Sequence, residues 1–175
     1  MTRDGRLPEL LAPAGSPEAL RAAVEGGADA VYFGASGFNA RAGARNFSDT
    51  ELRRAVEFCH GRGVRVYLTL NTLIYDRELR DYLAAAETAY LAGVDALIVA
   101  DIGGAAALRR TFPDLPLHAS TQMSGHSVGC AKERASLGFE RMVLAREMSF
   151  ADIAGFTRTS PIEAEVFIHG ALCVC

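Results

Sequence analysis

Short apolar runs alternate with longer amphipathic stretches along the whole chain. Glycine, proline and helix-capping residues separate them, as such residues separate strands from helices in folded proteins. Apolar runs of only a few residues between such boundaries are typical of buried strands. The pattern predicts seven strands, at residues 9–12, 31–33, 64–70, 97–100, 117–119, 141–144 and 163–169.

Six helices are expected in the intervals between these strands. Ser48 and Glu51 have the spacing of a capping box, which marks a helix start. Ser16 precedes a proline at the first helical position, a second start signal. Asp76 is expected to cap a helix over residues 77–91, and Ser149 the last helix of the chain.

Strict alternation of strands and helices predicts a parallel sheet with right-handed crossovers. The strands are short, apolar on both faces and evenly spaced, which favours a closed barrel over a doubly wound sheet. A (β/α) barrel has eight strands and roughly 250 residues, whereas this chain has 175 residues. We therefore expect a TIM-like (β/α) barrel with the eighth strand missing, a single domain over residues 1–175 that is a fragment of a longer protein. Its open edges would favour self-association.

Composition narrows the functional classes only a little. Hydrophobic residues make up 50% of the chain and the net charge is -3, so there is no overall attraction to nucleic acid or membrane. No apolar run approaches the length of a membrane span, and the N-terminus lacks the apolar region of a signal peptide. We expect a cytoplasmic protein with no membrane partner.

Four cysteines stand at positions 59, 130, 173 and 175. In a cytosolic chain, free thiols or metal ligands fit better than disulfides. Cys59 and Cys130 fall inside predicted helices, and we interpret both as buried core thiols. Cys173 and Cys175 have the alternation that lets them share a face and bind metal, but two thiolates do not complete a closed site.

Polar residues gather where the predicted strands end, which in a parallel barrel is where the chemistry lies. These ends carry Gly15, Arg41, Asn71, Thr72, Asp101, Thr121, Gln122, Arg146, Glu147, His169 and Cys173. Individually, such residues often cap helices or line a barrel mouth. Together they predict a functional pocket beside Cys173.

Several common chemistries do not fit this set. A Schiff-base aldolase needs a lysine on a strand, whereas Lys132 falls in a predicted helix. No His-Glu-x-x-His is present, Gly-x-Ser-x-Gly does not appear as a strand-to-helix turn, and no Gly-x-Gly-x-x-Gly follows the first strand. His169 and Cys173 would lie about 13 Å apart in an extended strand, so only a turn at Gly170 brings them within reach of proton transfer.

The segment Glu165-x-Phe167-x-x-Gly170-Ala171-Leu172-Cys173 resembles the opening of the signature of peptidase family U32, the collagenase-like proteins. The resemblance extends over nearly all of the chain. It includes Leu11-Ala12-Pro13-Ala14-Gly15, Gly27-Ala28-Asp29-Ala30-Val31-Tyr32, Asn39-Ala40-Arg41-Ala42, Leu70-Asn71-Thr72, Asp95-Ala96-Leu97-Ile98-Val99, His118-Ala119-Ser120-Thr121-Gln122 and Leu144-Ala145-Arg146-Glu147.

This resemblance implies a TIM-like barrel and four cysteines that hold a [4Fe-4S] cluster. Cys173 matches the first of those ligands, and the signature continues beyond Cys175. The cluster is therefore expected in the full-length protein and cannot be completed by this fragment. No ligand role is carried over to Cys175.

Better understood members of the family resemble oxygen-independent hydroxylation proteins that act on a tRNA uridine, an rRNA cytidine or the ubiquinone ring. Prephenate is implicated as an oxygen donor for the RNA members. The stretches at 39–42 and 119–122 make this chain look most like the RNA-modifying branch. On this basis we expect catalytic roles for Arg146, Glu147 and His169. Substrate binding is expected of Arg41, Asn71, Thr121 and Gln122.

The family name implies a different function, a collagenase-like peptidase that acts on peptides. The sequence has no recognisable peptidase nucleophile pair, which favours RNA hydroxylation. A third reading is that the chain is only one part of a scaffold. We expect enzymatic activity in the full-length protein and an inactive fragment.

Overall fold

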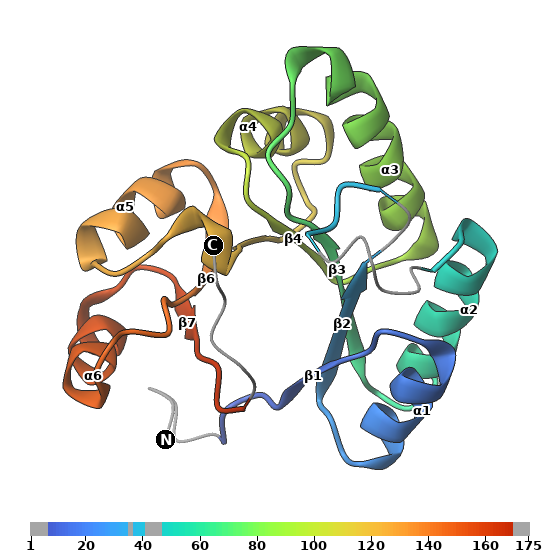
Figure 1. Cartoon of the computed structure of the whole chain (residues 1–175), viewed down its shortest axis with the longest axis horizontal. Coiled ribbons are helices and arrows are strands. Elements are labelled where there is room, and N and C mark those ends of the chain that lie inside the picture. The colour runs from blue at the N-terminus through green and yellow to red at the C-terminus, as the bar shows by residue number, and fades with distance from the viewer. Residues whose placement is uncertain (1–6, 35–36, 41–46, 170–175) are drawn as a thin grey trace.

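The computed structural model describes residues 7–34, 37–40 and 47–169. Within these residues, seven parallel strands form one sheet in the order β1-β2-β3-β4-β5-β6-β7. The strands are β1 Leu11–Pro13, β2 Ala30–Gly34, β3 Arg65–Leu70, β4 Ala96–Val99, β5 Leu117–Ala119, β6 Phe139–Val143 and β7 Glu163–Glu165. The sheet curls into an open barrel with its helices on the outside (Figure 1), as the sequence predicts.

Six α-helices connect the strands of the described part of the chain. They are α1 Pro17–Glu25, α2 Asp49–His60, α3 Leu79–Ala92, α4 Ile102–Thr111, α5 Val128–Ser136 and α6 Phe150–Thr159. Two short 3-10 helices, η1 Asp76–Glu78 and η2 Thr121–Met123, precede α3 and α5. None of the helices in the described ranges is long and apolar enough to cross a membrane.

The predicted helix starts are confirmed in three of the four cases. The Ser16 hydroxyl accepts from the Ala19 N–H at 3.2 Å, Ser48 and Glu51 form the capping box, and Ser149 caps α6. The cap predicted at Asp76 is wrong. Tyr75 occupies the cap position of η1, and its N–H donates to the Glu78 carboxylate at 2.8 Å. A 3-10 turn replaces the first turn of the expected helix.

The last strand is shorter than predicted. It pairs with β6 only as far as Val143 opposite Glu165, and the Leu144 N–H donates to the Glu165 carbonyl at 2.9 Å. Beyond that point Leu144 forms a bridge with Gly125, on the other side of β6. Residues 166–169 therefore leave the sheet, and Ile168 is 82% exposed.

Two layers of side chains cover the two faces of the sheet. The main core lies between the sheet and the helices and contains Val31, Leu68 and Leu97, all fully buried. The inner face carries a small apolar cluster of Ala30, Tyr67, Ala96 and Ile98, with Leu11 and Tyr32 against it. Burial of strand side chains on both faces is what the continuous apolar runs predict.

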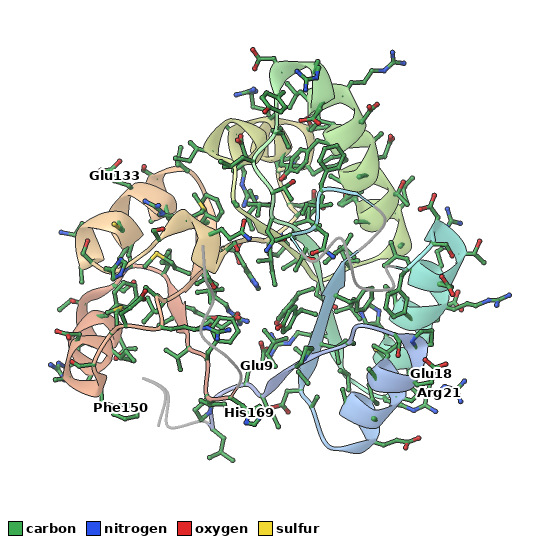
Figure 2. All side chains as sticks on the ribbon, in the orientation of Figure 1. Glu9, Glu18, Arg21, Glu133, Phe150 and His169 are labelled. Carbon is green, nitrogen blue, oxygen red and sulfur yellow. The ribbon has the colours of Figure 1, made fainter. Side chains whose placement is uncertain are left out.

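A group of charged and polar side chains lies in the barrel interior at the amino-terminal ends of the strands. We call this group the floor cluster: Glu9, Arg65, Tyr67, Arg141, Glu163 and Glu165. The Arg141 guanidinium donates to Glu9 at 2.7 Å and to Glu163 at 2.7 and 3.0 Å. Glu9 also pairs with Arg65 and accepts from the Tyr67 hydroxyl at 3.0 Å. Glu9, labelled in Figure 2, precedes β1, and Glu163 begins β7, so the cluster ties together the two ends of the open sheet.

Candidate active site

Asn71 organises the carboxyl end of the barrel, where it follows β3. Its side-chain oxygen accepts from the Ala40 N–H at 3.1 Å, in the loop after β2. Its amide nitrogen donates to the Ser120 hydroxyl at 3.3 Å, just beyond β5. Asn71 therefore links the ends of three strands, the place expected of a residue that shapes a barrel mouth.

The loop after β2 is held down by a second asparagine, Asn39, which is 8% exposed. The Thr69 hydroxyl donates to the Phe33 carbonyl at 3.2 Å and lies 3.3 Å from the Asn39 side-chain oxygen. This anchored loop leads directly to Arg41, which lies outside the described residues. The position of Arg41 stays a prediction.

Thr121 and Gln122 lie beside Asn71 through their neighbour Ser120. The Ser120 hydroxyl accepts from the Gln122 N–H at 3.3 Å and caps η2. Thr121 is half-buried and Gln122 is exposed. The structure thus brings three of the expected substrate-binding residues to one edge of the barrel.

Arg146 follows β6 and lies against the segment that follows β7. Its guanidinium carbon is 3.9 Å from the centroid of the Phe167 ring. Its Nε is buried and has no hydrogen-bond partner among the described residues. His169, two residues beyond Phe167, is exposed. The structure therefore places Arg146 next to the segment that leads to His169.

Glu147 has different neighbours from the rest of the expected set. Its side chain is 75% exposed, and its Oε2 lies 3.9 Å from the His126 Nε2. Both residues line a pocket between the loops that follow β5 and β6, which we call the lateral pocket. No contact within the described ranges joins Glu147 to Asn71 or to His169, so their convergence beside Cys173 stays a prediction.

Asp101 and Thr72 serve local structure at the same edge. The Asp101 carboxylate caps α4 by accepting from the Gly104 N–H at 2.7 Å. The Thr72 N–H donates to the Phe38 carbonyl at 3.2 Å. Capping is the ordinary role of an aspartate at a helix start, so the chemistry of the mouth falls to the other polar residues.

His118 points into the barrel interior below the mouth and is a residue for which the sequence suggested no role. Burial, with further contributions from Arg141 and Arg65, lowers its pKa from 6.5 to about 3, so the ring is neutral. The ring meets Tyr67 edge-on at a centroid distance of 4.8 Å. Its Nδ1 is buried without a hydrogen-bond partner in the described residues. The sequence signal that could have identified His118 is its spacing of two residues from Ser120, because residues two apart along a strand point to the same face of the sheet.

Glu165 also carries an orphaned atom in this interior. Burial raises its pKa from 4.5 to about 7, with Arg141 opposing the rise and Glu9 adding to it. Its Oε2 has no hydrogen-bond partner in the described part of the chain, although the Arg141 guanidinium lies 3.7 Å away. A carboxyl that titrates near neutrality is thus positioned eight residues before Cys173.

The two described cysteines differ from each other. Cys59 is buried in the core, and burial raises its pKa to about 11. Cys130, expected to be buried, is only half-buried because it lies in the first turn of α5, where the Ser127 hydroxyl lowers its pKa. No group of three or more residues able to hold a metal occurs among the described residues. The predicted ligand Cys173 lies outside them.

A curled parallel sheet with polar residues gathered at its carboxyl edge defines a protein of the TIM-barrel class. The sequence model of peptidase family U32 matches residues 15–175. The chain belongs to this family, as the signature beginning at Glu165 indicates.

Curated relatives carry names from both expected functions. The chain is 41% identical over 174 residues to the 23S rRNA 5-hydroxycytidine C2501 synthase of Escherichia coli, covering 99% of this chain and 26% of that protein. It is 40% identical over 170 residues to tRNA hydroxylation protein P1 of Bacillus subtilis, covering 95% and 40%. It is 34% identical over 178 residues to a collagenase of Porphyromonas gingivalis, covering 95% and 42%.

The chain spans between about a quarter and two-fifths of the length of these relatives. Among solved structures, that of the U32 peptidase Mk0906 superposes with a TM-score of 0.70 at 15% identity, covering 95% of this chain and 70% of that one. At that identity the likeness establishes the fold alone. It agrees with the barrel topology observed for β1 to β7.

Proposed function

We propose that the full-length protein hydroxylates a pyrimidine nucleotide of tRNA or rRNA, and that this chain forms the substrate side of its active site. The relatives of 41% and 40% identity are named for rRNA hydroxycytidine synthesis and tRNA hydroxylation. The proposed place of action is the cytoplasm, where tRNA and ribosomes are found.

Arg146 is the observation that carries this proposal. Its guanidinium stacks on Phe167 and keeps a buried Nε–H that no acceptor in the described residues satisfies. A half-buried arginine with an unused Nε–H donor suits a phosphate or carboxylate, because such charge-assisted hydrogen bonds are strong and directional. Arg146 would bind an RNA phosphate or the carboxylate of prephenate, the proposed oxygen donor.

The other residues of the mouth would orient the nucleotide. Asn71 is fixed by its contacts with Ala40 and Ser120, so it holds the edge to which Thr121 and Gln122 also belong. Arg41 is proposed to contact phosphate. His169 is proposed to move protons, and Glu147, which lies beside His126, is proposed to contact the RNA; the exposed side chains of both are accessible to substrate.

A [4Fe-4S] cluster, if bound by Cys173 in the full-length protein, would supply electron-transfer chemistry at this edge. Among the described residues, Cys59 is enclosed in the core, and Cys130 belongs to no group of three or more residues able to hold a metal. Its remaining ligands therefore have to come from outside the described residues. No step is assigned to the cluster itself.

The experiment compares RNA from cells with and without the gene. Mass spectrometry of digested tRNA and rRNA should show the loss of one hydroxylated pyrimidine, restored by the wild-type gene and at most weakly by Arg146→Ala. Arg110→Ala, an exposed arginine on α4, is the matched control and should restore it fully. Unchanged RNA in the deleted strain would refute the proposal.

The peptidase alternative rests on the relative named collagenase. It predicts that purified full-length protein cleaves denatured collagen while cellular RNA is unaffected by deletion. The described residues show no serine or cysteine nucleophile hydrogen-bonded to a histidine at the mouth. RNA hydroxylation therefore remains the function that the site supports best.

A further inference from the structure

The lateral pocket has a volume of about 360 Å³, within the range of small-ligand sites. Val128, Met148 and Phe156 form its apolar part, and His126, Glu147 and Asp152 supply its polar groups. These residues come from the loops after β5 and β6, from the first turn of α5 and from the first two turns of α6. The pocket therefore opens at the same edge of the barrel as the mouth.

His126 and Glu147 face one another in this pocket. The Ser124 carbonyl can only accept, so the His126 Nδ1–H donates to it at 3.1 Å, and Nε2 is then the acceptor in the neutral form of the ring. That Nε2 lies 3.9 Å from the Glu147 Oε2. The backbone holds the pair in place, because the Ala145 N–H donates to the Gly125 carbonyl at 3.1 Å. Such a pair is complementary to the N–H groups of a ligand.

Gly155 gives a second, independent indication that this space is used. It lies inside α6, where glycine costs about 0.5–1 kcal/mol relative to alanine. Neither backbone nor packing requires a glycine there, because a Cβ would meet nothing closer than the Arg158 guanidinium at 4.0 Å. The missing side chain leaves open space beside the lateral pocket, which Gly155 lines.

We infer, on the basis of the RNA substrate proposed above, that the lateral pocket binds a nucleobase with an exocyclic amino group, next to the nucleotide that reacts. An amino group offers two N–H donors to His126 and Glu147, while the base face covers the apolar side chains. Uracil lacks this group and presents carbonyl oxygens, which the Glu147 carboxylate repels. Adenine, cytosine and guanine are accepted and uracil is rejected.

The test measures binding of fluorescein-labelled hexacytidylate and hexauridylate to the full-length protein by fluorescence anisotropy at physiological salt. Wild type should bind hexacytidylate about tenfold more tightly, the size of one good base contact. Gly155→Leu fills the pocket and favours the helix, so it should remove this preference without lowering the melting temperature. Glu147→Gln should weaken the preference. Glu133→Gln, on the outer face of α5 (Figure 2), should leave it unchanged.

A wild-type protein without preference would overturn the inference, as would a preference that survives in folded Gly155→Leu. Denatured collagen is the competing ligand. If Gly155→Leu loses collagen binding but keeps its preference among oligonucleotides, the pocket binds a peptide side chain and the inference is wrong. The proposed function fails separately if deletion of the gene leaves RNA hydroxylation unchanged. If the gene is needed for hydroxylation but Gly155→Leu keeps the preference for hexacytidylate, only the assignment of the lateral pocket is refuted.

Discussion

Gly34 and Asn39 show how one residue shapes the mouth. A Cβ added at Gly34 would lie 1.7 Å from the Asn39 Nδ2, so Gly34→Ala must push Asn39 away from Thr69. We expect the free energy of unfolding to fall by about 1–3 kcal/mol, the cost of overpacking a buried site. Urea unfolding of the full-length protein measures this change.

Gly15→Ala is the matched control for that substitution. No atom lies within 4 Å of a Cβ built on Gly15. Alanine there should leave stability unchanged or raise it by up to about 1 kcal/mol, because it restricts the unfolded chain. Equal effects at the two glycines would contradict the close contact between Gly34 and Asn39.

Glu165 and His118 give the barrel interior two opposite pH dependences. The folded chain keeps the Glu165 proton up to about pH 7, whereas the unfolded chain releases it near pH 4.5, so this group lowers stability as the pH rises between those values. His118 stays neutral in the folded chain down to about pH 3, whereas the unfolded chain protonates it below 6.5, so this group lowers stability as the pH falls. The two contributions oppose each other between pH 4.5 and 6.5.

Substitution of Glu165 separates the two effects. Relative to wild type, Glu165→Gln should gain stability as the pH rises from 4.5 to 7, by up to about 3 kcal/mol at the upper end. Urea unfolding at a series of pH values checks this. Glu140→Gln, an exposed carboxyl on β6, is the control and should show no such trend. A difference that is constant with pH would contradict the burial of Glu165.

At the scale of elements, Arg141 holds β7 in place. Its side chain is 11% exposed and donates to Glu163 on β7 and to Glu9 before β1. Arg141→Met removes a cation from Glu163 and from the buried Glu9, which keeps only Arg65, and loss of one partner of a buried pair costs about 3–5 kcal/mol. Hydrogen exchange should also accelerate at the Leu144 N–H, which donates to the Glu165 carbonyl. Unchanged exchange and stability would show that β7 does not depend on Arg141.

The sequence predicted these elements well where the signals are local. Caps such as Ser48 and Ser149, and the short apolar runs, placed all seven strands and six helices in order. The length of β7 was not predictable, because it depends on where β6 stops pairing with β7, at the point where Leu144 forms its bridge with Gly125. The floor cluster was also missed, since Arg141 and Glu9 are 132 residues apart and meet only once the barrel curls. The pairing of Glu147 with His126 was missed for the same reason, because it depends on two neighbouring loops.

At the scale of the whole molecule, the open sheet has consequences for association. Within the described residues β1 and β7 each pair on one side only, and unpaired edges promote pairing between chains. We expect the chain of residues 1–175 to self-associate, so that its molar mass, measured by multi-angle light scattering, rises with protein concentration. Ile168→Glu, beside β7, should weaken association, whereas Leu91→Glu on exposed α3 surface should not. A monomer at high concentration would contradict the prediction.

The proposed cluster makes a second prediction for the whole molecule, because the chain holds only one of its expected ligands. Residues 1–175 alone should purify colourless and without iron, whereas the full-length protein made without oxygen should be brown. Cys173→Ala in the full-length protein should lose most of its iron, since thiolate is the ligand that such clusters require. Cys130→Ala should keep it, because the family signature that begins at Glu165 assigns no ligand role to that thiol. Iron analysis and visible absorption measure both variants, and full iron retention in Cys173→Ala would refute the assignment.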